Sequence, residues 1–361
     1  MGRLSNRILM KGNEAIAEAA IRAGCRHYFG YPITPQTEIS HYMAKRMRDV
    51  GGVFVQAESE IAAISMVYGA AGAGARAMTT SSSPGISLKQ EGFSYIAGAE
   101  LPCVVVNVER CGPGLGGILP AQGDYFQATK GGGHGDYRNL VLAPASVQEL
   151  YELTVDAFAL ADRYRVLCLI LADGTLGQMM EPVLYREDDA PRPATKDWAT
   201  TGTKGQRPHN VITSIYIDPE ILETHNLKLQ AKYAEIERNE VRCETVGLEG
   251  ADIVVTAFGT PARIVKNVVR MAADEGIRVG LIRPITLWPF PTKIVAEAAE
   301  RESVKAFLSV ELNAGQMVED VRLAVNGRKP VHFHGRMGGM LPTQREILDT
   351  IRAIVRGEGG K

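Results

Sequence analysis

The chain has 361 residues, of which 45% are hydrophobic and 22% are charged, and this is the composition of a globular protein with two or three domains. Its formal net charge of −1 argues against nucleic acid or an anionic membrane surface as a partner. No apolar run is long enough to span a membrane, and no N-terminal signal segment is visible. We therefore expect a cytoplasmic protein.

The five cysteines are widely spaced: Cys25, Cys103, Cys111, Cys168 and Cys243. They form no CxxC pair, and together with the histidines they show no zinc-ligand spacing. We interpret them as reduced thiols in a reducing compartment. Because an iron–sulfur cluster needs closely arranged cysteine ligands, we expect no cluster and no metal site in this chain.

Residues 1–185 alternate apolar strands with helical stretches, and this alternation predicts a doubly wound α/β domain. Unbroken apolar runs, such as Cys103–Val106 and Val166–Leu171, are typical of parallel strands buried on both faces. The expected strands are His27–Pro32, Val53–Ala57, Ala75–Thr80, Cys103–Val108, Leu140–Ala143 and Val166–Ala172. The expected helices are Asn13–Ala23, Thr37–Asp49, Glu58–Ala73, Ile86–Ala97 and Val147–Tyr164.

Residues 186–246 are expected to connect two domains. The composition turns polar from about Tyr185 to Pro208, which predicts an exposed connector. A charged helix is expected at about Asp218–Cys243, with Asp218 as its N-cap, and we interpret it as a solvated strut.

Residues 247–361 read as a second, smaller α/β domain. Its expected strands are Ile253–Phe258, Val279–Ile282, Ala306–Val310 and Val331–His334. Its expected helices are Pro261–Glu275, Pro291–Ala299, Gly315–Val325 and Pro342–Arg356.

Candidate site residues follow the predicted strands, at the edge where open α/β sheets bind their ligands. Thr34, in Gly30–Pro35, either meets a carboxylate near a helix N-terminus or is a plain helix cap. The carboxylates of Glu58 and Glu60 either complement a helix dipole or place one acid in a cleft.

Two further segments contain groups that bind anions. The small residues of Thr79–Ile86 predict a cradle of N–H groups and hydroxyls or, alternatively, a tight capped turn; the lysine spacing of a nucleotide P-loop is missing. Arg110 ends the most apolar strand and is suited to a carboxylate or phosphate, unless it pairs with Glu109 or Glu100. The glycine-rich stretch Gly112–Gly117 could close over a ligand. His134, in a later loop, is a general base or a structural hydrogen-bonding residue.

Taken in order, these motifs resemble the alpha subunits of 2-oxoacid:ferredoxin oxidoreductases, over nearly the whole chain. The resemblance is nearest to the branched-chain (3-methyl-2-oxobutanoate) type, with the 2-oxoglutarate and phenylglyoxylate types as relatives. The motifs are Tyr31–Pro35, Gln56–Glu60, Thr80–Gln90, Val108–Arg110, Ala121–Asp136, Leu140–Gln148, Leu176–Pro182, Arg283–Pro291, Val310-Glu311 with Gly315–Met317, and Gly335–Gly339.

The resemblance implies a doubly wound domain that binds the pyrimidine of thiamine diphosphate, followed by a smaller domain like the C-terminal domain of transketolase. The family's diphosphate motif, Gly-Asp-Gly followed by Asn-Asn, is absent, because Ala172-Asp173-Gly174 lacks the downstream asparagines. A beta-type partner should therefore bring the diphosphate site with Mg²⁺. Partner subunits, including gamma-type and ferredoxin-like delta-type subunits, should carry the [4Fe-4S] clusters.

By the same resemblance, Glu60 is the carboxylate that hydrogen bonds the aminopyrimidine ring nitrogen. That contact favours the tautomer that takes the proton from the thiazolium C2. Ser82, Pro84 and Gly85 are the further cofactor-binding residues. Glu58 is the alternative to Glu60 if the register is displaced by two residues.

For the substrate, the resemblance implies that Thr34 faces the 2-oxoacid carboxylate and that Arg110 lies near the substrate or coenzyme A. Asp124 falls in the same region, without a defined role. Thr34, Glu60 and Arg110 are thus the expected catalytic residues.

The implied reaction is coenzyme-A-dependent oxidative decarboxylation of a 2-oxoacid to an acyl-CoA and CO₂, with electrons passed to ferredoxin or another acceptor. Branched-chain or aromatic substrates are favoured because only Arg110 offers an obvious cation, although Lys89 or Lys130 could supply a second one. The alternatives are 2-oxoglutarate or phenylglyoxylate as substrate, a non-oxidative thiamine-dependent decarboxylase or transketolase-like subunit, and a non-catalytic scaffold.

Overall fold

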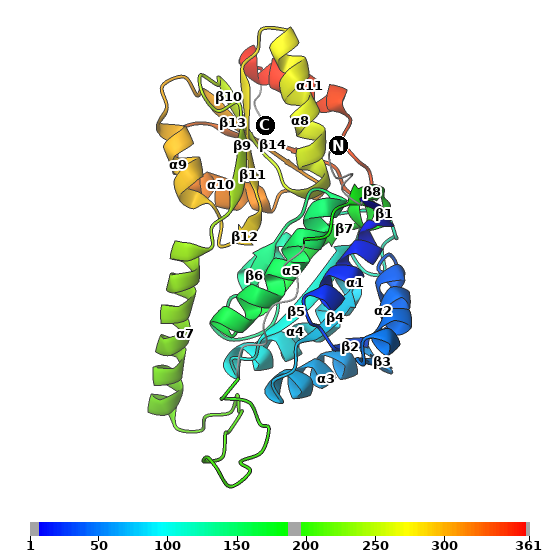
Figure 1. Cartoon of the computed structure of the whole chain (residues 1–361). Coiled ribbons are helices and arrows are strands. Elements are labelled where there is room, and N and C mark those ends of the chain that lie inside the picture. The colour runs from blue at the N-terminus through cyan, green and yellow to red at the C-terminus, as the bar shows by residue number, and fades with distance from the viewer. Residues whose placement is uncertain (1–6, 187–195, 359–361) are drawn as a thin grey trace, which may run out of the picture.

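In a computed structural model, which describes residues 7–186 and 196–358, two α/β units are stacked end to end (Figure 1). The larger unit is built on a seven-stranded sheet. Its strands are β2 (His27–Gly30), β3 (Val53–Gln56), β4 (Ala77–Ser81), β5 (Cys103–Glu109), β6 (Leu140–Leu142), β7 (Leu167–Asp173) and β12 (Thr286–Trp288). Their order is β12-β6-β7-β5-β4-β2-β3, and all pairs are parallel except β12 with β6.

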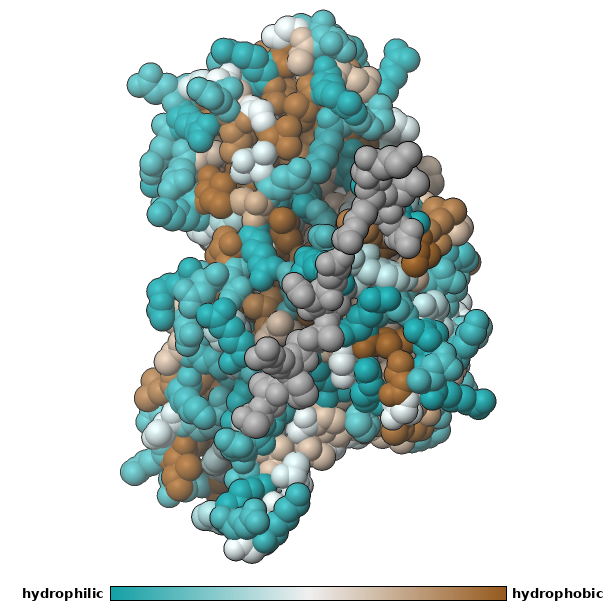
Figure 2. All heavy atoms as spheres, in the orientation of Figure 1, coloured by the Kyte–Doolittle hydropathy of each residue, from teal (hydrophilic) through white to brown (hydrophobic). Residues whose placement is uncertain are grey.

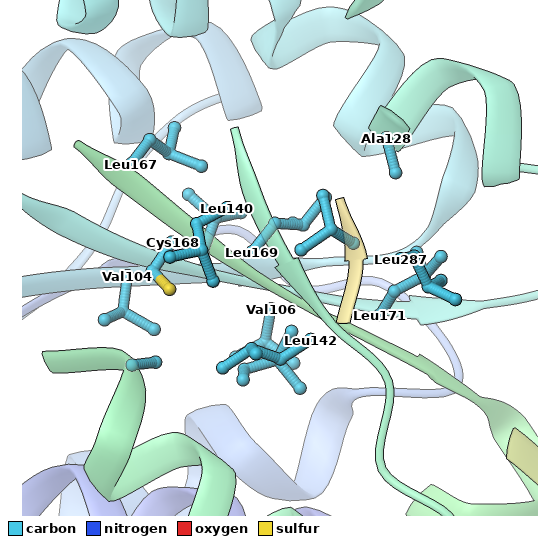
Figure 3. Close-up of a cluster of buried hydrophobic side chains, with 14 of the residues drawn as sticks. Val104, Val106, Ala128, Leu140, Leu142, Leu167, Cys168, Leu169, Leu171 and Leu287 are labelled. Atoms are coloured by element: carbon cyan, nitrogen blue, oxygen red, sulfur yellow. The ribbon is translucent and has the colours of Figure 1, made fainter. Parts of the chain in front are cut away.

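Helices cover both faces of this sheet, which confirms the predicted doubly wound architecture. One group of helices packs together as α1 (Gly12–Arg22), α2 (Thr37–Asp49) and α5 (Val147–Tyr164), and a second group consists of α3 (Glu60–Gly72) and α4 (Ser83–Gly98). All residues of β5 and β7 are buried, as the unbroken apolar runs predict. Figure 3 shows the resulting core, which fills both faces of the sheet: Val104 and Val106 of β5 lie on one face, and Leu167 and Leu169 of β7 lie on the other.

The smaller unit has a five-stranded sheet with the order β14-β13-β10-β11-β9. Its strands are β9 (Cys243–Val246), β10 (Ile253–Thr256), β11 (Val279–Pro284), β13 (Ala306–Glu311) and β14 (Val331–Gly335), and its helices are α8 (Gly259–Asp274), α9 (Thr292–Glu300), α10 (Met317–Val325) and α11 (Gln344–Val355). The edge strand β9 is antiparallel to β11, and the other pairs are parallel.

The helix between the units, α7 (Pro219–Asn239), is only partly a solvated strut. Asp218 caps it as predicted, through hydrogen bonds from the N–H groups of Glu220 and Ile221. It ends before Cys243, which starts strand β9 instead. Its C-terminal half buries Leu229, Tyr233 and Ile236 against the core of the larger unit.

Part of the predicted polar connector, residues 187–195, lies outside the described residues. The part that follows packs against the larger unit: Ala199 is buried, and the Trp198 ring lies under the Arg165 guanidinium at 4.3 Å. On the face shown in Figure 2, polar residues cover most of the surface and apolar side chains form separate patches. Among the described residues, no helix is both long and apolar enough to cross a membrane.

Candidate functional site

The predicted site residues lie at the carboxyl ends of neighbouring parallel strands. Thr34 follows β2, Glu60 follows β3, Ser82 follows β4 and Arg110 follows β5. Because β3, β2, β4 and β5 are adjacent in the sheet, these residues share one edge of the larger unit.

The two carboxylates after β3 have different surroundings. Glu60 is the first residue of α3 and is only 6% exposed, whereas Glu58 is exposed. Ser59 caps the helix by accepting a hydrogen bond from the N–H of Ala62 at 3.2 Å, so Glu60 is not needed as the cap. Within the described residues its carboxylate has no hydrogen-bond partner, and its acceptor oxygens are free for a ligand.

Helix α4 begins closer to the strand than the sequence predicts. The expected cradle of residues 79–86 is reduced to Ser82, because α4 starts at Ser83 with Pro84 in its first turn. The hydroxyls of Ser81 and Ser82 are buried and have no partner among the described groups. Such orphaned hydroxyls at a strand end are rare unless a ligand engages them.

Gly85 lets this helix approach the Glu60 carboxylate. A Cβ at Gly85 would lie 2.6 Å from Oε1 of Glu60 and 2.1 Å from Oγ of Ser81. Residue 85 must therefore be a glycine for α4 to pack this closely against the carboxylate. A buried carboxylate and two unpaired hydroxyls together offer the hydrogen-bonding groups that fit a polar ring such as a pyrimidine.

Arg110 joins two loops and, among the residues that the structure describes, forms no ion pair. Its Nη1 donates to the carbonyl of Thr34 at 3.1 Å, and its Nη2 donates to the carbonyl of Leu115 at 3.2 Å. The predicted alternatives, pairing with Glu109 or with Glu100, are wrong: Glu100 pairs with lysines of α7, and Glu109 points into the core. Arg110 has five N–H donors and uses two of them here.

Next to Arg110 in the chain lies the buried carboxyl of Glu109, which is close to the half-buried Asp124. Glu109 accepts a hydrogen bond from the N–H of Asp124 at 2.9 Å, and Asp124 accepts one from the Asn107 amide at 2.8 Å. Burial raises the pKa of the Glu109 carboxyl well above its usual value, and the nearby Asp124 and Asp173 raise it further. Burial also raises the pKa of Asp124, opposed by hydrogen bonds from Ser83 and Asn107.

Asp124 also reaches a cleft of about 440 Å³ between the two units. The larger unit lines it with Pro84, Arg110 and Gly112–Gly114, and the smaller unit with Asn313 and Gln316. Neither Asn313 nor Gln316 was predicted to line a site. Their position directly after β13 and at the start of α10 is the signal that could have found them.

Gln122, which follows the glycine-rich stretch in the chain, is hydrogen bonded to the smaller unit. Its side chain donates to the carbonyl of Phe258 at 3.0 Å and accepts from the N–H of Leu312 at 3.1 Å. Its backbone carbonyl accepts from the Asn313 amide at 2.8 Å. The cleft therefore has fixed walls on both sides, while residues 112–116 of the loop are exposed.

The loop with Thr34 is held from below. The carbonyl of Pro35 accepts hydrogen bonds from the Asn13 amide at 2.8 Å and the Gln178 amide at 3.1 Å. Thr34 itself is exposed at the strand edge.

Two residues considered from the sequence lie elsewhere or are already paired. His134 is exposed and packs against Tyr95 near the C-terminal end of α4, the end opposite Pro84. Lys130 forms an ion pair with Asp320 of α10. The described residues contain no group of three His, Cys, Asp or Glu side chains that could hold a metal ion.

Each of the two units matches the profile of a known protein family. A family profile described as pyruvate flavodoxin/ferredoxin oxidoreductase, thiamine-diphosphate-binding, matches residues 18–245, and one described as pyruvate:ferredoxin oxidoreductase core domain II matches residues 251–347. The chain is 52% identical over 346 residues to the ketoisovalerate oxidoreductase subunit VorB of Methanothermobacter thermautotrophicus, covering 96% of this chain and 97% of that one.

Two solved structures are similar in fold. The 2-oxoglutarate:ferredoxin oxidoreductase of Magnetococcus marinus, with 2-oxoglutarate, coenzyme A and succinyl-CoA bound, matches with a TM-score of 0.87 and 28% identity, over 97% of this chain and 66% of that chain. A split-gene transketolase, an inactive β4 tetramer, matches with a TM-score of 0.60 and 13% identity, over 96% of this chain and 98% of that chain. The second likeness concerns the fold alone, and it agrees with the transketolase-like architecture expected from the sequence.

Proposed function

The chain belongs to the 2-oxoacid:ferredoxin oxidoreductase family, and we propose that it is the subunit that holds the pyrimidine ring of the shared thiamine diphosphate. When bound, that cofactor supplies an electron sink for decarboxylation of a 2-oxoacid. The residues of this chain would bind and orient the ring, hold a proton at Glu60 and position the substrate.

The observation that carries this proposal is the contrast between Glu60 and Glu58. Of the two, only Glu60 is buried, and its carboxylate, which packs directly against Gly85, has no hydrogen-bond partner within the described residues. A carboxylate in a dry site interacts strongly with a ring nitrogen and can exchange a proton with it. Ser82 and Pro84, at the start of α4, would border the same ring.

Arg110 and Thr34 would bind the substrate carboxylate. Each terminal nitrogen of Arg110 keeps one N–H after the two loop contacts, whereas Nε is buried; a guanidinium is suited to bidentate carboxylate binding. Because Arg110 also ties the Thr34 loop to the glycine-rich loop, substrate binding there would order both. The cleft beyond Arg110, bordered by Asp124, would admit coenzyme A.

The diphosphate, Mg²⁺ and [4Fe-4S] clusters would belong to beta-, gamma- and delta-type partners. Asp173, the one candidate in this chain for a diphosphate motif, already has structural partners. Its carboxylate accepts hydrogen bonds from the N–H groups of Thr175, Leu176 and Thr260. Asp173 therefore serves as a helix cap, and its carboxylate oxygens are already used in these bonds.

We propose branched-chain 2-oxoacids as the substrates, as for the ketoisovalerate enzyme with 52% identity. A distal carboxylate, as in 2-oxoglutarate, needs a second cation. Lys130 is paired with Asp320, and Lys89 is fully buried, so neither offers a free charge in the cleft.

The test is anaerobic co-purification of the chain from its native cells, followed by assay with a panel of 2-oxoacids, coenzyme A and a viologen dye. We expect iron–sulfur partners to copurify and 3-methyl-2-oxobutanoate to reduce the dye only when coenzyme A is present. Preference for 2-oxoglutarate would overturn the substrate assignment. Decarboxylation without dye reduction, or a chain that purifies alone, would overturn the oxidoreductase assignment.

A further inference from the structure

Lys89 of α4 is buried in an unfavourable place. Its side chain is fully buried, which is rare for a lysine unless it is paired with an acidic group. Its Nζ donates a hydrogen bond to the backbone carbonyl of Glu60 at 3.2 Å, and no ion pair to Lys89 forms among the described residues. Burial lowers the pKa of Lys89 to about 8, while the negative charge of Glu60 opposes the shift.

Helix capping does not explain this contact. The carbonyl of Glu60 lies in the first turn of α3, where carbonyls already have partners within the helix; unpaired carbonyls lie at the other end. A positive charge near a helix N-terminus is also disfavoured by the helix dipole. Burial of the Lys89 ammonium is therefore unfavourable, and its contacts with the helix do not compensate for the lost solvation.

The surrounding geometry directs Lys89 toward Glu60. Gly85, Lys89 and Gly92 lie on one face of α4, at helical spacing, and this face packs against α3. A Cβ at Gly92 would lie 2.6 Å from the Ile64 side chain, so the two helices cross closely just below the Glu60 carboxylate. The two glycines bring the helices near enough for the lysine to reach the first residue of α3.

The other titratable groups nearby belong to different networks. Tyr137 bonds to Gln90, the residue after Lys89, at 3.4 Å. Arg110 contacts Ser83 and loop carbonyls, and Asp124 is bonded to Asn107. Within the described residues, none of these groups bonds to Lys89 or to the carboxylate of Glu60.

We propose that Lys89 is a positioning residue for the reaction: its buried ammonium fixes the start of α3 and stabilises the negative charge of the Glu60 carboxylate. A carboxyl that keeps its charge in a dry site is the stronger proton donor toward a ring nitrogen once it is protonated. This inference rests on the proposed function, in which Glu60 meets the pyrimidine.

The test compares the wild-type chain with K89M, which removes the charge, and K89R, which keeps it. Infrared difference spectra of the full chain against the matching E60Q variant isolate the Glu60 carboxyl, without cofactor or turnover. In K89M, we expect the Glu60 carboxylate to become protonated at a pH roughly one unit or more above that of the wild type. The reason is that a neighbouring opposite charge shifts the midpoint of a carboxyl group by about that amount. K89R should restore the wild-type midpoint.

The acidic limb of the pH profile of kcat/KM, measured on the assembled complex, should shift in the same direction in K89M and return in K89R. If K89M does not fold, K89Q takes its place in both measurements. A midpoint and a profile that are unchanged in the uncharged variant would overturn the inference.

The two proposals fail differently. If E60Q is inactive but K89M titrates like the wild type, only the role of Lys89 is wrong. If E60Q stays active while K89M shifts the titration, Lys89 is coupled to Glu60 but Glu60 is not the pyrimidine carboxylate.

Discussion

At the scale of single residues, the site depends on small differences in burial and space. Glu60 and Glu58 are two positions apart, yet one is enclosed and the other faces outward. The enclosed carboxylate is accommodated because α4 presents a glycine, Gly85, at the point of closest approach.

We predict that Gly85→Ala will lower activity of the complex by at least an order of magnitude. The new Cβ would lie 2.1 Å from Ser81 Oγ and 2.6 Å from Glu60 Oε1, so the carboxylate must move. The measurement is kcat/KM together with the melting temperature. The matched control is Gly69→Ala in α3, where a Cβ meets nothing within 4 Å and the helix should gain slightly in stability. Equal activity in both variants would contradict the close approach.

The buried carboxyl of Glu109 predicts a pH-dependent stability. Its folded-state pKa is raised by burial, so the folded chain holds the proton more tightly than the unfolded chain. Its favourable contribution is therefore fully present below the unfolded pKa and is lost as the pH rises through the folded pKa.

Glu109→Gln removes this titration. We expect its melting temperature, relative to the wild type, to rise between about pH 5 and pH 8, by roughly 2–4 °C for each kcal/mol of charge burial avoided. Thermal unfolding of the full chain across this range provides the measurement. Parallel curves for the two proteins would show that Glu109 is not held in its neutral form.

At the scale of elements, Asp173 connects two helices from different units. One oxygen accepts from the N–H groups of Thr175 and Leu176 at the start of α6 (Gly174–Gln178). The other accepts from the N–H of Thr260 at the start of α8. Two helix N-termini thus share one carboxylate.

We predict that Asp173→Asn will destabilise the chain by about 1–3 kcal/mol, because the amide NH₂ would face an N–H donor that then has no acceptor. Chemical denaturation gives the free energy of unfolding. Asp218→Asn at the exposed start of α7 is the control; there asparagine caps equally well, and we expect almost no change. A loss at Asp218 as large as that at Asp173 would contradict the bridging role.

The long strands and helices could be predicted because periodicity and apolar runs determine them locally. β5 and β7 are such cases. Among the short strands that were not predicted are β1 (Ile8–Lys11), which pairs with β8 (Met180–Val183), and β12, which crosses from the second unit into the first sheet. These short antiparallel strands are specified by distant partners and not by their own pattern. The same holds for the π-helix at Gln127–Gly131.

For the site, the sequence predicted the position of the residues but not their contacts. Strand-end position identified the region of Thr34, Glu60 and Arg110. Local sequence could not show that Arg110 would bond to loop carbonyls, since Thr34 and Leu115 meet it only in three dimensions. The burial of Lys89 was likewise invisible, because it depends on the crossing of α3 and α4.

At the scale of the whole molecule, the two units are locked together, so the cleft between them has a fixed shape. Arg283 of β11 is 2% exposed and binds Glu149 of α5 through both terminal nitrogens, at 2.9 and 2.7 Å. Its Nε donates to Glu244 of β9 at 2.7 Å. Together with Gln122 and β12, this pair holds the second unit against the first.

The most direct test of the account is the activity of complexes carrying E60Q or E58Q, measured as coenzyme-A-dependent dye reduction with 3-methyl-2-oxobutanoate. The substitutions are chemically identical and two residues apart. We predict that E60Q loses activity by about a hundredfold or more, as for loss of a proton-transfer group, while E58Q stays near the wild type. Retained activity in E60Q, or an equal loss in E58Q, would contradict it.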